Sequence, residues 1–274
     1  MRRILAAASI AAVLAAAACD GADPEPVRSP SGPNSAAARG WAAPPANGLF
    51  DYQLGGAYQP AAGVTIVDRD RTAPALPDIY GICYVNAYQT QPGENDWWQA
   101  EHPDLVLKKE DPDWPGEHLL DISTPAKRAA LGEIVGGWFA GCAASGFRAV
   151  EPDNLDSYTR SGGLLSEEHA VAYAQILVVK AHESGLAIGQ KNAADFDGRR
   201  IGFDFAVTEE CAVYDECGTY LGRYGDQVYE IEYTDNGIGA YRQACRDHGA
   251  RISIILRDRD VIPQGEAGYH YESC

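Results

Sequence analysis

The stretch Phe205-Ala206-Val207-Thr208-Glu209-Glu210 is a short run of mostly apolar residues that ends in two acidic side chains. Similar runs recur along the chain, each followed by polar or charged residues. Near-continuous apolar runs of this length are typical of strands that are buried on both faces of a parallel sheet. We therefore predict eight such strands, at residues 50–54, 64–67, 80–85, 148–151, 187–190, 205–208, 228–232 and 252–256.

Helical patterns separate several of these runs, at residues 124–144, 166–185 and 238–248. Ser or Thr opens the first two helices as an N-cap, and a glycine lies close to the end of each of the three. Some other connections are too short for a full helix, so we expect an irregular outer layer. The long loop after the third run is predicted to contain a small hairpin made by residues 104–108 and 118–122.

The polar residues that end the apolar runs decide between two α/β architectures. A (β/α)8 barrel brings the carboxyl ends of all its strands into one ring, where its active site is built. An open doubly wound sheet binds ligands only where its strand order reverses. Polar endings on so many runs favour a TIM barrel, a (β/α)8 α/β fold, as a single domain over residues 47–274. These endings are Asp68 and Asp70; Asn86; Glu151, Asp153 and Asn154; Gln190, Lys191 and Asn192; Glu209 and Glu210; Glu232 and Asp235; Arg257 and Asp258.

The first 46 residues have the composition of an export signal followed by a tether. Arg2 and Arg3 precede an apolar, alanine-rich stretch, so residues 1–18 are predicted to be a signal peptide. Small residues before Cys19 resemble a lipobox, which would make Cys19 a lipidated anchor; ordinary cleavage at the same place is the alternative. Residues 19–46 are predicted to be a flexible linker. We expect an extracytoplasmic protein, secreted or held at the cell surface, whose only membrane contact is this anchor.

The chain has seven cysteines, and removal of Cys19 leaves six. An even number of cysteines in an exported chain predicts three disulfides, for which fifteen pairings are possible. Proximity in the chain favours Cys211–Cys217, and a bond from Cys245 to Cys274 would fix the C-terminus. The third pair is then the remaining one, Cys83–Cys142. Zinc binding is disfavoured because no C-x2-C ligand set is present.

The formal net charge is -17, from 39 acidic and 22 basic residues. Such a surface repels nucleic acid and attracts cationic ligands. The sequence contains no glycine-rich nucleotide motif, no H-E-x-x-H and no G-x-S-x-G. We therefore predict no cofactor and no metal, although a site made of acids alone for Mg²⁺ or Ca²⁺ stays open.

Two acidic clusters end runs that lie two strands apart, at residues 150–156 and 208–211. Glycosidases use two carboxyl groups that flank the scissile bond, about 5–5.5 Å apart for retention and about 6.5–9.5 Å apart for inversion. Capping and salt bridges are the alternative role for such acids, but two clusters on facing strands favour the catalytic one. Lys191 could instead be a Schiff-base nucleophile, although nearby acids favour a charged, paired lysine.

An ordered set of motifs runs along the chain, at residues 50–56, 83–86, 150–156, 189–192, 209–211, 216–217, 232–235 and 256–258. This set resembles the family 114 glycoside hydrolases. The resemblance implies a (β/α)8 barrel that cleaves α-1,4-linked galactosamine within a partly deacetylated exopolysaccharide. It further implies Asp153 as the nucleophile and Glu210 as the acid/base, with Glu209 as the alternative acid. We expect a monomer that binds the polysaccharide.

Protonated amines make polygalactosamine a polycation, so we predict an acidic groove and aromatic contacts around the catalytic pair. Two alternatives remain: a surface lipoprotein that binds the polymer without cutting it, and a glycosidase for another α-linked polysaccharide. The predicted substrate-binding residues are Asp68, Asp70, Tyr84, Asn86, Trp97, Trp98, Glu151, Asn154, Asp156, Lys191, Asn192, Glu209, Glu232, Asp235, Arg257 and Asp258.

Overall fold

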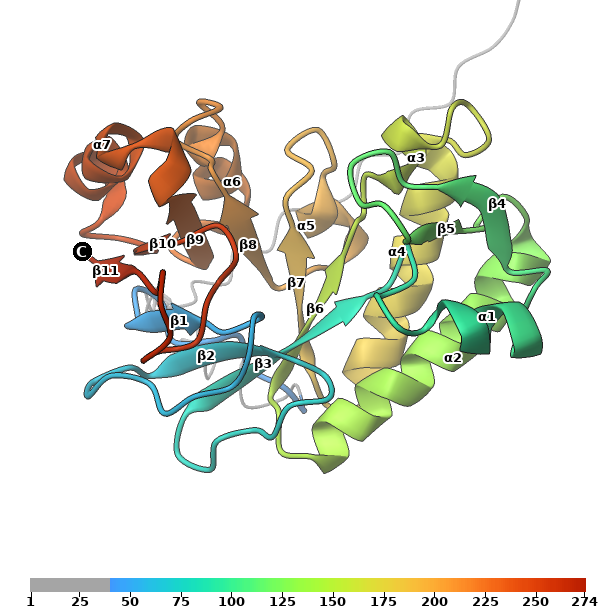
Figure 1. Ribbon diagram of the computed structural model, residues 1–274, viewed down its shortest axis with the longest axis horizontal. Helices are drawn as coiled ribbons and strands as arrows, with labels where there is room; N and C mark the ends of the chain where they lie inside the picture. The colour runs from blue at the N-terminus through green and yellow to red at the C-terminus, as the bar shows by residue number, and fades with distance from the viewer. Residues whose placement is uncertain (1–39) are drawn as a thin grey trace, which may run out of the picture. The chain divides into compact units, whose positions relative to one another are not determined.

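Eight parallel strands form the centre of the molecule, and they pair in the order of the chain (Figure 1). The computed structural model describes residues 40–274; the predicted signal peptide, Cys19 and most of the predicted tether lie outside the described residues. All eight predicted strands are confirmed, with shifts of up to three residues at their ends. They are β1 (Phe50–Tyr52), β2 (Ile66–Asp70), β3 (Tyr80–Asn86), β6 (Ala149–Asp153), β7 (Ala187–Lys191), β8 (Phe205–Glu209), β9 (Val228–Tyr233) and β10 (Ser253–Arg257).

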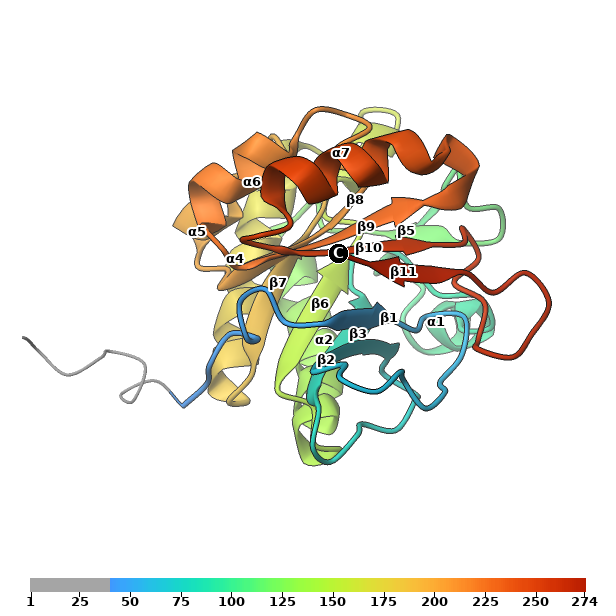
Figure 2. The same ribbon diagram turned by 90° about the vertical axis from the view of Figure 1, so that its left-hand side faces the viewer.

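The sheet curls so that β1 and β10 approach each other, and side chains bridge their seam. The Ser253 hydroxyl donates to the carbonyl of Gly48 at 2.7 Å, and the Arg257 guanidinium donates to the carbonyl of Tyr52. A ninth strand, β11 (Tyr271–Ser273), pairs antiparallel with β10, and its Tyr271 hydroxyl donates to the carbonyl of Phe50 at 2.7 Å. The predicted (β/α)8 barrel is therefore confirmed as a nearly closed barrel (Figure 2).

Alternate residues of each strand point into the barrel, because successive side chains of a strand face opposite ways. Phe205 and Val207 of β8, and Tyr229 and Ile231 of β9, belong to the same interior cluster. Continuing this alternation to the carboxyl ends places Glu209 on the inner face, whereas Glu232 lies on the outer face. The pleat thus decides which acidic residues can reach the mouth of the barrel.

The helices form an uneven outer layer. The predicted helices are confirmed as α2 (Pro125–Ala144), α4 (Glu167–Glu183) and α7 (Ile238–His248). The Thr124 side chain accepts from the amide of Lys127, and Ser166 forms a capping box with His169. Shorter helices complete the layer: α1 (Asn95–Glu101), α3 (Ser157–Arg160), α5 (Gly198–Ile201), α6 (Cys217–Tyr224) and the 3-10 helix η2 (Thr234–Asn236).

The predicted hairpin in the long third loop is confirmed as β4 (Val106–Glu110) and β5 (His118–Leu120), which pair antiparallel. In Figure 1 this hairpin lies near α1 and α3, toward the end of the barrel where β6 and β7 finish. The hairpin is fixed to the rest of the fold by a salt bridge of 2.7 Å from Arg160 to the buried Asp111. Its connecting turn can therefore present side chains to the mouth of the barrel.

Three disulfides join barrel elements to the outer layer, and their pairing is the predicted one. Cys83 of β3 bonds Cys142 of α2, Cys245 of α7 bonds the C-terminal Cys274, and Cys211 after β8 bonds Cys217 at the start of α6. Disulfides of this kind typically contribute about 2–4 kcal/mol, largely by restricting the unfolded chain.

Residues 41–45 were predicted to belong to the tether, but they pack against the barrel. Trp41 stacks on His182 with ring centroids 3.7 Å apart, and the hydroxyl of Tyr229 donates to the carbonyl of Pro44 at 3.0 Å. The ordered domain therefore starts before residue 47. Between residues 40 and 274 no helix is both long and apolar enough to cross a membrane.

Candidate active site

A buried lysine from β7 lies at the centre of the acidic side chains at the mouth of the barrel. Lys191 Nζ is 3.5 Å from Asp153 Oδ2, 3.1 Å from Glu209 Oε2 and 3.3 Å from Glu151 Oε1. The hydroxyl of Tyr52 accepts a fourth contact at 3.0 Å. Side chains from β1, β6, β7 and β8 thus converge on one ammonium group.

Lys191 fixes the separation of the two candidate catalytic carboxyl groups. The distances from Lys191 Nζ to Asp153 Oδ2 and to Glu209 Oε2 sum to about 6.6 Å, so these two oxygens cannot be farther apart than that. That upper limit lies at the bottom of the inverting range of about 6.5–9.5 Å and includes the retaining range of about 5–5.5 Å. The arrangement is therefore compatible with direct attack by one carboxylate.

Pairing between opposite charges favours the ionised forms of Lys191 and Glu209. Burial alone would lower the pKa of Lys191, but Asp153 and Glu209 raise it well above its usual value. Burial likewise opposes ionisation of Glu209, but Lys191 and hydrogen bonds from Tyr233 and Asn192 lower its pKa. A protonated Lys191 has no lone pair to attack a carbonyl, which argues against the Schiff-base alternative.

A second carboxyl pair lies deeper in the barrel. Asp68 and Glu151 are fully buried, and neither carboxyl oxygen of Asp68 has a hydrogen-bond partner within the described residues. Burial and the charge of Glu151 raise the pKa of Asp68 well above its usual range, which favours its neutral form. Both had been predicted to line a groove, but full burial removes them from direct contact with a polymer. They instead form the floor beneath Lys191.

The two adjacent glutamates after β8 point to different places. Glu209 accepts from Asn192 Nδ2 at 2.9 Å and from the hydroxyl of Tyr233, while its own amide donates to Asn192 Oδ1 at 2.7 Å. Glu210 has a left-handed backbone, with φ of 62°, and its carboxylate pairs with Arg259 at 2.5 Å. Only Glu209 therefore faces Asp153 and Lys191.

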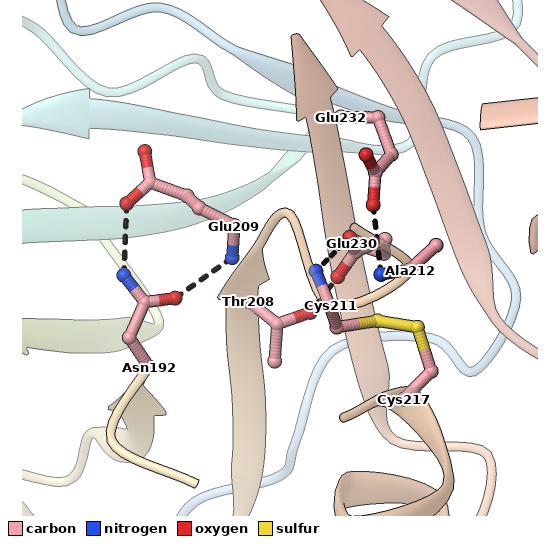
Figure 3. Close-up of a disulfide and its surroundings, with 8 residues drawn as sticks. All are labelled: Asn192, Thr208, Glu209, Cys211, Ala212, Cys217, Glu230 and Glu232. Carbon is pink, nitrogen blue, oxygen red and sulfur yellow. Dashed lines mark hydrogen bonds between the residues drawn. A yellow bond between two sulfur atoms is a disulfide. The ribbon is translucent and has the colours of Figure 1, made fainter. Parts of the chain in front are cut away.

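Two outward-facing glutamates of β9 hold the turn that carries Glu209 (Figure 3). Glu230 accepts from the amide of Cys211 at 2.8 Å, and Glu232 accepts from the amide of Ala212 at 2.9 Å. Burial raises the pKa of Glu230 well above its usual value, which favours its neutral form. Glu232 therefore supports the turn from behind. The sequence had predicted instead that Glu232 lines the mouth and binds substrate.

Replacing Glu232 by methionine is expected to destabilise the fold by about 1–3 kcal/mol, because the amide of Ala212 loses its acceptor inside the protein. Turnover should fall as well, since the turn after Glu209 loses one of its two supports. Glu232→Gln keeps an acceptor and should stay close to wild type in both respects. Melting curves and rates of the two variants check this; equal behaviour of both would contradict it.

The Cys211–Cys217 disulfide also lies beside Glu230 (Figure 3). Within residues 40–274 these two sulfurs and the Glu230 carboxylate make up the one cluster with the spacing of a metal site. Because both sulfurs are joined in the disulfide, they are not free to act as thiolate ligands.

A cavity of about 460 Å³ opens above Lys191. Asp153 and Glu209 lie in its wall, and a second cavity of about 370 Å³ continues on the other side of Glu209. Several predicted binding residues line one of the two cavities. They are Asp70, Tyr84, Asn86, Asn154 and Lys191 in the first cavity, Asp156, Asn192 and Glu210 in the second, and Glu209 in both.

Other predicted binding residues lie elsewhere. Trp98 is 0% exposed and packs edge-on against Trp138 of α2, and Trp97 packs beside it, so these rings fix the loop to the barrel. Asp235 pairs with Arg259 at the rim. Arg257 and Asp258 are buried at the seam, where Asp258 accepts from the amides of residues 262 and 270.

Sequence reasoning missed residues that the fold brings into the cavity. Tyr52 and Tyr233 contact Lys191 and Glu209, and Gln89 and Glu117 enter from the third loop. The alternation along β1 and β9 is a signal that could have identified the two tyrosines. A loop has no comparable periodicity, so the positions of the loop residues could not be predicted from the sequence.

Comparison with known proteins agrees with this geometry. The model of glycoside-hydrolase family GH114 matches residues 31–274. The structure of Ega3 from Aspergillus fumigatus in complex with galactosamine is 24% identical, with a TM-score of 0.68, over 84% of this chain and 96% of that one. The glycoside hydrolase domain of PelA from Pseudomonas aeruginosa is 13% identical, with a TM-score of 0.54, over 80% and 98% of the two chains. No curated protein sequence matches the chain.

The two solved structures have the same fold as this chain, and the family model covers the entire barrel. The converging carboxyl groups at its mouth are the equipment that hydrolysis of a glycosidic bond requires. The chain belongs to glycoside-hydrolase family GH114 and is a glycoside hydrolase.

Proposed function

We propose that this enzyme cleaves α-1,4-galactosaminide bonds within a cationic, partly deacetylated polysaccharide, with retention of configuration. The observation that carries the proposal is the Lys191 contact to both Asp153 and Glu209, which holds one oxygen of each carboxyl group within about 6.6 Å of the other, a limit that includes the retaining range. Support for the substrate comes from Ega3, a protein of the same fold that was solved with galactosamine.

In the proposed first step, Asp153 Oδ2 attacks the anomeric carbon while Glu209 gives its proton to the glycosidic oxygen. The bond between the anomeric carbon and the glycosidic oxygen breaks. In the second step, Glu209 takes a proton from water, whose oxygen attacks the anomeric carbon and releases Asp153. The hydroxyl of Tyr84 donates to Asp153 Oδ2 at 2.8 Å, which orients the nucleophile. Glu209 takes the acid/base role in place of Glu210 because Glu209 faces Asp153.

The surroundings of the cleft support a cationic substrate. Asp70, Asp153, Glu117, Glu209 and Asp260 line the first cavity, and the chain has a net charge of -17. A polymer with protonated amines is attracted to such a surface over distances of about one Debye length, roughly 8 Å at physiological ionic strength. The three disulfides support a location outside the cytoplasm, in agreement with the predicted export signal.

Release of reducing ends from partly deacetylated galactosamine polymer tests this proposal. We expect oligosaccharides from this polymer and none from uncharged α-linked glucans, with a rate that falls as salt is added. A salt-independent rate would contradict recognition by charge. Tight binding of the polymer without cleavage would instead favour a polymer-binding lipoprotein, and cleavage of another polysaccharide would reassign the substrate.

A further inference from the structure

A buried carboxylate that lines the cleft forms no salt bridge within the described residues. Glu117, in the turn before β5, is 7% exposed and lines the first cavity. Its charged neighbours are Asp153 and Asp111, both acidic, and among the described residues it forms no salt bridge. The cations that pair with these two acidic neighbours, Lys191 with Asp153 and Arg160 with Asp111, form no salt bridge with Glu117. An unpaired buried carboxylate is costly, so this position suits a cationic ligand.

Two amide side chains orient Glu117 so that one of its oxygens stays available. Asn86 Nδ2 and Gln89 Nε2 both donate to Oε2, at 3.2 and 2.6 Å. Asn86 is itself fixed, because its Oδ1 accepts from Asn154 Nδ2 at 2.9 Å. Oε1 takes part in no hydrogen bond within the described residues. The carboxylate is therefore held by one oxygen, and its second oxygen can accept from a ligand.

Gln89 supplies an independent sign of a missing donor. This residue is 1% exposed and lines the same cavity, yet its Oε1 has no hydrogen-bond partner. Its orientation is set by the bond from Nε2 to Glu117, so the carbonyl oxygen cannot turn away to find a donor. Buried acceptors are nearly always paired, and a ligand with several N–H groups would satisfy this one together with Glu117.

We propose that Glu117 and Gln89 bind a protonated primary amine of the sugar chain, and that they select for a deacetylated unit at this position. The proposal rests on the proposed function for its substrate. An ammonium group has three donors, enough for Glu117 Oε1, Gln89 Oε1 and water. An N-acetyl group offers one donor and no charge, and its methyl group would desolvate the carboxylate without pairing it. The site thus discriminates by charge as well as by shape.

Glu117→Gln tests the site, because glutamine keeps an acceptor for Asn86 and Gln89 while it removes the charge. On fully deacetylated polymer, kcat/KM should fall by about 10- to 100-fold, the loss expected for a charged hydrogen bond. On N-acetylated polymer, kcat/KM should be unchanged or higher. Glu110→Gln, on the same hairpin and outside the cavity, is the matched control and should affect neither polymer.

Mass spectra of products from partly acetylated polymer give a second readout. Wild type should leave a deacetylated unit at one fixed position from the cut, and Glu117→Gln should lose that preference. Gln89→Met, which removes the unpaired carbonyl, should shift it in the same direction. If all variants lose activity equally on both polymers, Glu117 only holds the hairpin in place and the proposal is overturned.

Direct binding separates this proposal from the proposed function. Galactosamine, galactose and N-acetylgalactosamine serve as probes in saturation-transfer NMR with the full domain. We expect wild type to prefer galactosamine and Glu117→Gln to lose the preference. If wild type cuts no galactosamine polymer but shows this pattern, the proposed reaction fails and the amine site stands. Equal binding of the three sugars by wild type would overturn the amine site.

Discussion

Replacing Glu209 by glutamine is expected to lower the turnover of galactosamine polymer by about 10³-fold, the size typical of a lost general acid/base. Glutamine has nearly the same shape: its carbonyl oxygen can still accept from Asn192, and its amide group can donate to the hydroxyl of Tyr233, so the fold should survive. Glu210→Gln is the matched control, because Glu210 lies next in the chain and pairs with Arg259 at the rim. Its turnover should fall by less than about tenfold.

Reducing-end release by the two variants, with melting curves to confirm folding, distinguishes the two glutamates. A large loss in Glu210→Gln together with a small loss in Glu209→Gln would return the acid/base role to Glu210. Similar large losses in both would mean that the turn acts as one unit and that the carboxylate facing Lys191 has no special role.

Replacing Lys191 by methionine is expected to destabilise the protein by about 3–5 kcal/mol at neutral pH, because three carboxylates lose a buried partner. Lys191 lowers the pKa of Glu209, and a carboxyl group with a lowered pKa stabilises the fold above its unfolded pKa. That stabilisation is lost as the pH falls through the folded pKa. The difference in melting temperature between wild type and Lys191→Met should therefore shrink in acid.

Lys180→Met is the matched control for stability, since Lys180 pairs with the exposed Glu133 at the surface. Exposed pairs of this kind contribute little to stability, because water screens both charges. A loss of stability in Lys191→Met no larger than in Lys180→Met would show that the buried carboxyl groups do not depend on Lys191.

The same variant should change the pH profile. Glu209 must be protonated to act as the acid, so kcat/KM falls as the pH rises through the pKa of Glu209. Because that pKa is lowered, this falling limb lies on the acidic side of neutrality. Removal of Lys191 raises the pKa of Glu209, so this limb should move to higher pH even as the maximal rate falls. An unmoved limb would indicate that another group controls it.

Much of the barrel could be predicted from the sequence, because buried parallel strands are short apolar runs and their polar endings mark one edge. The hairpin and the three confirmed helices followed from turn residues and caps. The short α1 and α6 did not, since helices of seven and eight residues depend on packing more than on local signals.

The site was less accessible, and Glu209 shows why. Similarity of a Glu-Cys pair favoured Glu210, whereas the alternation from Phe205 through Val207 places Glu209 on the inner face. The left-handed backbone at Glu210 breaks that alternation, and nothing in the sequence marks it. Similarly, Trp98 was predicted to contact sugars but is buried against Trp138, because an aromatic residue in a loop can equally well fix that loop to the core.

The most direct test of the paired-carboxylate account is to locate the covalent sugar. Glu209→Ala would be treated with α-galactosaminyl fluoride, whose leaving group needs no acid, and the protein would be digested and analysed by mass spectrometry. Because this variant lacks the base for the second step, a glycosyl group should accumulate on the peptide that contains Asp153. No adduct together with release of the inverted sugar, or an adduct on another residue, would contradict the account.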